Sequence, residues 1–298
     1  MGRGFHETSA AARRVFEEAS DALGLDLRRL CFEGPEAALQ LTANTQPAVL
    51  TVSVAAARAL TEHGLEPTIV AGHSLGEYSA LVVAGALGLA DAVRVVRRRG
   101  ELMQDAVPVG TGAMAAILGV EPSVVEAICR DAAQGEVVEV ANINSSTQVV
   151  VAGHRAAVER AVALAAARGG RRSVLLPVSA PFHCRLMAPA ADRLAGVLEG
   201  IAVGAPRVPV VRNVDAGVTT RAEEVRPFLV RQMTAPVRWT ECIGRMAADG
   251  ATVFLEVGPG RVLTGLLKRI DGALRGFAVE DPPSLEKTAA ALAAGSGS

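Results

Sequence analysis

The chain has 298 residues and a mass of 30.7 kDa, the size of one large or two modest domains. Hydrophobic residues make up 50% and charged residues 20%, a composition that excludes a mostly disordered chain. Lys and Arg number 30 and Asp and Glu 31, so the net charge of -1 gives no reason to expect nucleic acid or an anionic membrane as a partner.

Targeting and metal-binding signals are weak throughout the sequence. No apolar stretch approaches the roughly 18 residues that cross a bilayer, and the start lacks the apolar region of a secretory signal. The four cysteines lie far apart without a CxxC pair, which argues against a zinc site or a disulfide framework. We expect a soluble cytoplasmic protein without a bound metal.

Helical patterns alternate with short β-branched runs, which favours an α/β architecture with parallel strands. In chain order the patterns predict a helix over 9–19, a helix over 48–60 opened by Gln46-Pro47, a buried strand over 68–71, a helix from Leu75 and a helix over 90–99.

A turn-like stretch from Val107 to Gly112 marks a break in this pattern. The predicted elements beyond it are a strand over 113–119, a helix over 122–133, strands over 137–143 and 148–152, a helix over 154–167 and a strand over 172–176. This βαββαβ order is typical of a ferredoxin-like unit, so we predict a small subdomain over residues 110–177.

The remaining chain, residues 1–109 and 178–298, is predicted to form the second, larger subdomain. Its later elements are a helix over 187–198, a strand over 208–212, helices over 223–232 and 240–249, a strand over 252–256, a surface helix over 288–294 and a disordered tail over 295–298.

The strongest local signal for chemistry is the run Val70-Ala-Gly-His-Ser-Leu-Gly-Glu77. A strand, Gly-x-Ser-x-Gly and a helix in this order form a nucleophile elbow, which exposes Ser74 at a helix N-terminus between Gly72 and Gly76. The N–H of Leu75 can then face a developing oxyanion. The alternative is a glycine-rich turn with Ser74 as a helix cap.

A serine nucleophile needs a base, and the chain has five histidines. His183 follows a predicted strand in a loop, where α/β sites assemble. His6 and His63 are predicted to be exposed, His154 starts a helix, and His73 neighbours Ser74 but points elsewhere. On position alone, a catalytic His183 and a loop histidine without a role both stay open.

Several ordered motifs resemble one family, the malonyl-CoA:acyl-carrier-protein transacylases and related acyltransferase domains of fatty-acid and polyketide synthesis. The matching motifs are Gly72–Glu77, Arg99-Gly100 with Met103-Gln104, Gly112–Ala115, Ala141-Asn142 with Asn144, Ala180–His183, Asn213-Val214, Gln232 with Pro236–Trp239, and Glu256–Gly260. With this resemblance we expect an α/β fold, an α/β-hydrolase-like parallel-sheet core carrying the inserted ferredoxin-like subdomain.

The resemblance implies a Ser–His dyad. Ser74 would attack the thioester and become malonyl-Ser, and His183 would take its proton and return it to the leaving thiol. The main-chain carbonyl of Gln232 would orient the imidazole. Arg99 would pair with the free carboxylate of the malonyl group, because a guanidinium can donate two parallel hydrogen bonds to it. Without the resemblance, Arg99 could belong to a solvated basic run.

Other residues are expected to border the substrate. Phe182 looks like the bulky residue of malonyl-selective members, since a larger ring leaves less room for a branched acyl group. Met103, Asn142, His73 and Leu75 are also placed at the pocket, although Met103 and Asn142 could equally be ordinary packing residues.

The sequence thus predicts an enzyme that moves malonyl from malonyl-CoA to the phosphopantetheine thiol of an acyl carrier protein in fatty-acid synthesis. No bound cofactor and a monomer are expected. The alternatives are a trans-acting polyketide-synthase acyltransferase, an acyl hydrolase, or a truncated inactive form that binds the carrier protein.

One departure from the family pattern concerns the start of the chain. Members begin with an apolar strand and a Gly-Gln-Gly type turn, whose glutamine supplies the second oxyanion amide, and this sequence starts just after that turn. We expect the sequence as written to be impaired in stability, activity or both, because a lost oxyanion donor costs about 10²–10³ in rate.

Overall fold

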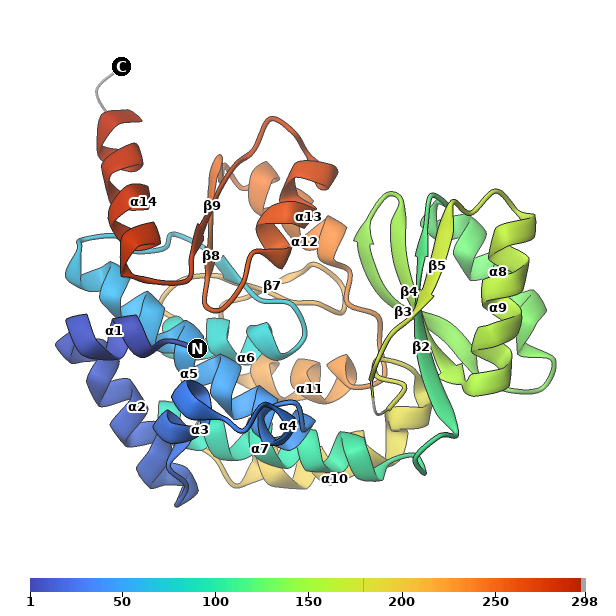
Figure 1. Ribbon diagram of the computed structural model, residues 1–298, viewed down its shortest axis with the longest axis horizontal. Helices are drawn as coiled ribbons and strands as arrows, with labels where there is room; N and C mark the ends of the chain where they lie inside the picture. The colour runs from blue at the N-terminus through green and yellow to red at the C-terminus, as the bar shows by residue number, and fades with distance from the viewer. Residues whose placement is uncertain (179, 296–298) are drawn as a thin grey trace.

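The N-terminal part of the chain is helical and forms one side of a larger body (Figure 1). A computed structural model describes residues 1–178 and 180–295. The first elements are α1 (Arg3–Thr8), α2 (Ala10–Leu23), α3 (Leu27–Glu33), α4 (Glu36–Leu39) and α5 (Thr42–Glu62). Ser9 caps α2 by accepting the N–H of Ala12, and Gly24 ends it in the left-handed conformation. The predicted helix from Ser9 is therefore confirmed and runs one turn further.

Helix α5 begins earlier than the sequence pattern predicted, because Pro47 lies inside it rather than at its start. Contacts with preceding residues hold its first turn: Asn44 donates to the carbonyl of Ala38, and Thr45 donates to that of Leu39. These contacts offset the one intrahelical hydrogen bond that the proline removes.

The middle of the larger body contains the strand–turn–helix unit. Strand β1 (Val70–Ala71) leads into α6 (Leu75–Val83), which is followed by α7 (Leu89–Asp105). Strand β1 pairs in parallel with β6 (Val210–Val211), and β6 pairs antiparallel with β7 (Val218–Thr219). The predicted parallel sheet is therefore only partly parallel, because a short reversal at residues 212–217 returns the chain antiparallel beside β6.

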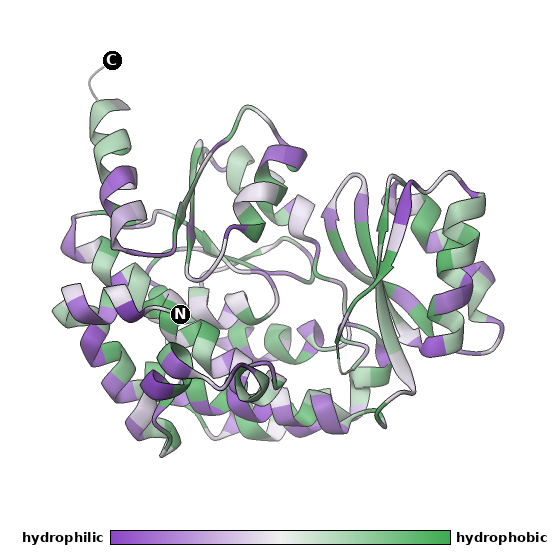
Figure 2. Cartoon of the chain, in the orientation of Figure 1, coloured by the Kyte–Doolittle hydropathy of each residue, from purple (hydrophilic) through white to green (hydrophobic). Residues whose placement is uncertain are grey.

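The smaller part of the molecule is built on its own antiparallel sheet (Figure 1). Its elements are β2 (Gly112–Leu118), α8 (Pro122–Ala133), β3 (Val138–Ser145), β4 (Gln148–His154), α9 (Arg155–Ala167) and β5 (Arg172–Leu175). The strand order is β3-β4-β2-β5, and both helices cover one face. Small and β-branched side chains fill the space under α8 and α9, and Figure 2 shows these strands as largely hydrophobic. The predicted βαββαβ order is confirmed.

The rest of the chain returns to the larger body. It contains the 3-10 turn η1 (Arg185–Met187), α10 (Ala188–Glu199), α11 (Ala222–Gln232), α12 (Trp239–Ala248), β8 (Val253–Val257), α13 (Val262–Ile270), β9 (Arg275–Val279) and α14 (Pro282–Gly295). Strands β8 and β9 form a separate parallel pair. Helix α14 is longer than the predicted surface helix and buries Leu285. Of the predicted disordered tail over 295–298, Gly295 ends α14, and residues 296–298 lie outside the described residues.

Within residues 1–178 and 180–295, none of the helices is both long enough and apolar enough to pass through a bilayer. The four cysteines are buried and unbridged.

We predict that Gly100→Ala destabilises the protein. A Cβ at Gly100 would lie 2.7 Å from both the Cα of Ala43 and the carbonyl oxygen of Thr42, so α7 would be forced away from α5. Overpacking of this kind costs about 1–3 kcal/mol. Gly196, in α10, has open space around its Cα, so Gly196→Ala should raise stability by about 0.5–1 kcal/mol. Denaturant unfolding of both variants measures this difference, and equal effects would contradict it.

Candidate active site

Ser74 sits on a strained turn between β1 and α6. Its φ of 52° lies in the left-handed region, which is costly for a residue with a side chain. Gly72 makes the turn possible, since a Cβ there would lie 1.9 Å from the carbonyl carbon of Gly76. Gly76 itself has open space at its own Cβ position. Of the two glycines that flank the serine, only Gly72 is therefore required by the close approach of the backbone.

The hydroxyl of Ser74 lies 2.7 Å from Nε2 of His183. On the other side of the ring, Nδ1 lies 2.9 Å from the main-chain oxygen of Gln232. Because a carbonyl can only accept, Nδ1 carries the proton and Nε2 faces the serine with its lone pair. The structure thus brings together the Ser74–His183 pair and the carbonyl of Gln232 that orients the imidazole, as the resemblance implied.

His183 is held in an unusual conformation by the chain around it. Its φ is 61°, and the following residue, Cys184, donates its thiol to the carbonyl of Pro181. Burial and the charge of Arg99 lower the pKa of His183 to about 3. The imidazole is therefore neutral near pH 7 and able to accept a proton.

Arg99 is buried and reaches the same serine from α7. Its Nη2 donates to the hydroxyl of Ser74 at 3.1 Å and to Oε1 of Gln232 at 3.0 Å, and its Nη1 donates to Oε1 of Gln46 at 2.7 Å. The guanidinium also lies 5.4 Å from the ring centre of Tyr78. Among the described carboxylates, none lies within ion-pair distance of Arg99, so this buried cation faces the nucleophile without a directly paired carboxylate.

His73 links the turn to the smaller part of the molecule. Its Nε2 lies 2.9 Å from Oδ1 of Asn144, on β3, and its ring lies 5.5 Å from that of Trp239. It does not contact the base, as expected from its position beside Ser74.

The other predicted residues are less directly connected. Oδ1 of Asn142 is buried without a hydrogen-bond partner among the described residues. Met103 is buried in the core, where its sulfur lies 3.8 Å from Nε2 of Gln46. Phe182 packs between the two hydrophobic clusters that meet beside His183. Leu75 starts α6, so its N–H has no acceptor within the helix.

Glu77 and Asn213 also belong to the network and received no individual role from the sequence. Glu77 is buried, and its Oε2 accepts from the N–H of Asn213 at 3.0 Å and from Nε2 of Gln232 at 2.9 Å. Oδ1 of Asn213 accepts the N–H of Ser74 at 2.7 Å. The available signal was a glutamate three residues after the serine, in a helix with no other charged residue.

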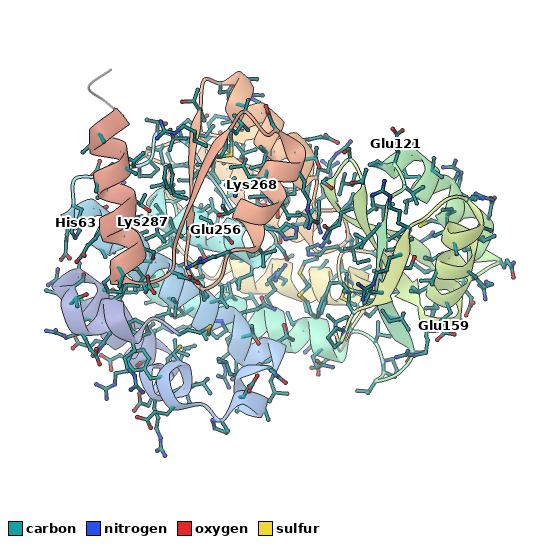
Figure 3. All side chains as sticks on the ribbon, turned by 45° about the horizontal axis from the view of Figure 1, so that its top comes forward. His63, Glu121, Glu159, Glu256, Lys268 and Lys287 are labelled. Atoms are coloured by element: carbon teal, nitrogen blue, oxygen red, sulfur yellow. The ribbon has the colours of Figure 1, made fainter. Side chains whose placement is uncertain are left out.

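The other acidic and histidine candidates lie elsewhere. Glu256 caps α13 by accepting from the N–H groups of Leu263 and Thr264, and Figure 3 shows it beside that helix. His63 is exposed at the rim of the molecule (Figure 3), as predicted, whereas His6 is only partly exposed because its ring packs against Phe16 and Phe32. In the part of the chain that the structure describes, no group of His, Cys, Asp and Glu could hold a metal ion.

A family model, the acyl transferase domain, matches residues 1–273. This chain belongs to the acyl transferase domain family. Its relatives include two proteins named malonyl CoA-acyl carrier protein transacylase. The one from Escherichia coli O157:H7 is 53% identical over 91% of this chain and 88% of its own length. The one from Bacillus subtilis (strain 168) is 45% identical over 96% and 90%.

Solved structures of the family share the whole fold. An acyl carrier protein S-malonyltransferase from Vibrio cholerae O1 biovar eltor superposes with a TM-score of 0.95 at 49% identity, covering 97% of this chain and 94% of the other. A malonyl-transacylase solved in complex with its type II PKS acyl-carrier protein gives a TM-score of 0.95 at 49% identity, covering 98% and 94%.

We predict that Gly72→Ala unfolds the turn, whereas Gly76→Ala does not. The first substitution places a Cβ inside the backbone of residue 76, and the second meets no atom within 4 Å. Thermal unfolding of the two variants measures the difference: a large fall in Tm is expected for the first and a nearly unchanged Tm for the second. A Tm for Gly72→Ala close to that of Gly76→Ala would contradict the close backbone approach at this turn.

Proposed function

We propose that this protein transfers a malonyl group from malonyl-CoA to the phosphopantetheine thiol of an acyl carrier protein through malonyl-Ser74. The observation that carries the proposal is the convergence on one oxygen: the hydroxyl of Ser74 lies 2.7 Å from Nε2 of His183 and 3.1 Å from Nη2 of Arg99. The similarity to transacylases and malonyltransferases over nearly the whole chain supports the two substrates.

In the first half-reaction, Oγ of Ser74 attacks the thioester carbon of malonyl-CoA while Nε2 of His183 takes its proton. The N–H of Leu75 donates to the oxyanion that forms. When the C–S bond breaks, the imidazolium returns the proton to the coenzyme A thiolate. Malonyl-Ser74 and the free thiol remain, and the carbonyl of Gln232 holds the ring in one orientation throughout.

In the second half-reaction the carrier thiol gives its proton to Nε2 of His183 and attacks the malonyl carbon. The bond to Oγ of Ser74 breaks, and the serine oxygen recovers the proton from His183. The malonyl group leaves as a thioester of the carrier protein. This scheme uses the side chains of Ser74 and His183, the main-chain groups of Leu75 and Gln232, and the two substrates.

Arg99 selects a substrate with a free carboxylate. A buried guanidinium without a carboxylate partner strongly favours an anion placed beside it. Its present partners are the neutral oxygens of Gln46, Gln232 and Ser74, which a carboxylate can replace with stronger, charge-assisted hydrogen bonds.

Five further residues border the acyl and pantetheine groups in this proposal. His73 and Asn142 lie on the side of the small sheet, and Oδ1 of Asn142 is buried without a hydrogen-bond partner among the described residues. Phe182 limits the size of the acyl group, Leu75 supplies the amide at the oxyanion, and Met103 supports Arg99 through Gln46.

Two carrier proteins fit this chemistry, one for fatty-acid synthesis and one for polyketide synthesis. We favour the fatty-acid carrier protein, which is the partner predicted from the sequence. The similarity to a transacylase bound to a type II PKS carrier protein makes a polyketide carrier the second candidate. The monomeric state and the cytoplasmic location stay predictions.

We further propose two subdomains, residues 1–109 with 178–298 and residues 110–177. The four-stranded sheet over residues 112–175 has its own hydrophobic cluster under α8 and α9, which supports the division. Its strand order and βαββαβ sequence favour a ferredoxin-like subdomain. The parallel β1–β6 pair and the strand–elbow–helix unit favour an α/β-hydrolase-like core for the larger subdomain.

Brief mixing with malonyl-CoA is predicted to leave one malonyl group on the wild-type protein, and none on Ser74→Ala. His183→Ala should acylate at least about 10²-fold more slowly, because the base is lost. Intact-protein mass spectrometry measures the adduct. A folded wild-type protein without an adduct would contradict the proposed reaction and favour the inactive carrier-protein-binding form.

Arg99→Ala is predicted to lower the rate of malonylation about 10²-fold while acetylation by acetyl-CoA falls less, because only malonyl offers a carboxylate. Arg99→Lys keeps the charge but cannot donate the two parallel hydrogen bonds, so its malonylation rate should lie between those of the wild type and Arg99→Ala. The measurement is the ratio of malonyl to acetyl adduct under competition. An unchanged ratio in Arg99→Ala would remove Arg99 from substrate selection.

A further inference from the structure

We propose that Glu77 is a positioning residue for acyl transfer, whose buried carboxylate holds Gln232 and Asn213, and through them the base and the nucleophile, in their reacting geometry. The inference rests on the proposed function, since it concerns the same serine and histidine. Glu77 itself contacts neither reacting atom.

Glu77 is placed for this role by its position in α6. It lies one turn after Ser74, and its N–H donates to the carbonyl of Ser74 at 3.1 Å. Its side chain is 3% exposed. One oxygen, Oε2, accepts from two segments that are distant in sequence, the N–H of Asn213 after β6 and Nε2 of Gln232 at the end of α11. The carboxylate therefore joins three elements at one point.

The bond to Gln232 acts on the base and on the cation. The carbonyl of Gln232 accepts from Nδ1 of His183, so a shift of this residue moves the imidazole. Its carboxamide stands between Glu77 and Arg99, with Nε2 on the carboxylate and Oε1 on the guanidinium. The amide dipole is favourably oriented at both ends, because the N–H faces the anion and the oxygen faces the cation.

The bond to Asn213 acts on the nucleophile. The side chain of Asn213 accepts the N–H of Ser74 at 2.7 Å and donates to the carbonyl of Gly72 at 2.8 Å. The two hydrogen bonds hold the backbone of the strained turn at Gly72 and at Ser74, on either side of residue 73. Because Glu77 accepts the N–H of Asn213, it fixes the position of the asparagine side chain that binds the backbone of Ser74.

The charges around Glu77 explain why a carboxylate is suited to this place. Arg99 on α7 and Arg212 after β6 favour its ionised form, and Tyr78 on its own helix and Cys242 on α12 are the other titratable neighbours. Burial nevertheless raises the pKa of Glu77 to about 7. Glu77 is therefore an anion above about pH 7 and is neutralised below it, whereas His183 stays neutral until about pH 3.

The linked effect on stability has a defined sign. The folded pKa of Glu77 lies above its unfolded value of 4.5, so this group stabilises the fold most below pH 4.5 and that contribution is lost as the pH rises to about 7. If Glu77 were purely structural, its substitution would change only this stability. Substitution of a positioning residue also changes the rate of acylation.

The test compares Glu77→Ala, Glu77→Gln and a matched control, Glu256→Gln, in which the altered carboxylate caps α13 away from the site. Rapid-quench measurement of malonyl-Ser74 gives kcat and KM for acylation by malonyl-CoA from pH 5 to 9. We expect Glu77→Ala to lower kcat about 10²-fold with KM within about twofold, as misplacement of reacting groups does. Glu77→Gln, which keeps an accepting oxygen but never carries the charge, should match the wild-type rate at pH 5, where Glu77 is neutral, fall below the wild-type rate at pH 8, and show no acid limb near pH 7.

Three results would overturn the inference: a wild-type kcat in folded Glu77→Ala, an acid limb near pH 7 retained in Glu77→Gln, or the same kinetics in Glu77→Gln and Glu256→Gln. If Glu77→Ala does not fold, the pH profile of Glu77→Gln alone decides. Failure of the proposed function is a separate result, because the wild-type protein would then form no malonyl adduct at any pH.

Discussion

Gln232 ends α11 with its carbonyl and both ends of its carboxamide engaged. The carbonyl meets His183, Oε1 meets Arg99, and Nε2 contacts the carbonyl of Ser74, the carboxylate of Glu77 and, at 3.3 Å, Oδ1 of Asn213. These partners come from four segments that are distant in sequence: residues 74–77, Arg99, His183 and Asn213. A buried side chain whose polar atoms are all paired tolerates little displacement, so the site has one arrangement.

Charge is balanced in this site across a neutral amide rather than by direct contact. Arg99 and Glu77 do not form an ion pair, and the carboxamide of Gln232 lies between them. A direct pair would neutralise the charge of the guanidinium and weaken its attraction for a substrate carboxylate. Separation by the amide keeps both charges stabilised while Arg99 still faces Ser74.

The smaller part of the molecule takes part in the site through its edge strand. Strand β3 pairs with β4 on one side, and on the other its backbone meets the chain at Val237. This bridge brings Asn144 to His73, the residue beside the nucleophile. The two parts are therefore joined at the reacting turn, where a change in one is felt by the other.

The sequence by itself determined the local structures. The βαββαβ unit, the strand–Gly-x-Ser-x-Gly–helix turn and most helices follow from hydrophobic period and turn residues, which act within a few positions. The early start of α5 could not be predicted, because contacts of Asn44 and Thr45 with the preceding segment override the usual position of a proline.

The family resemblance singled out Ser74, Arg99, His183 and Gln232, and the tertiary structure decided how they meet. Their separations of up to 158 residues leave no local pattern from which distances could be derived. Glu77 and Asn213 escaped prediction for the same reason: an acidic residue in a helix with no other charged residue and an asparagine after a strand acquire meaning only when folding brings them together. The local sequence determined the nucleophile and its turn. Long-range packing determined the partners of Ser74, because buried polar groups are stable only when they are hydrogen-bonded to one another.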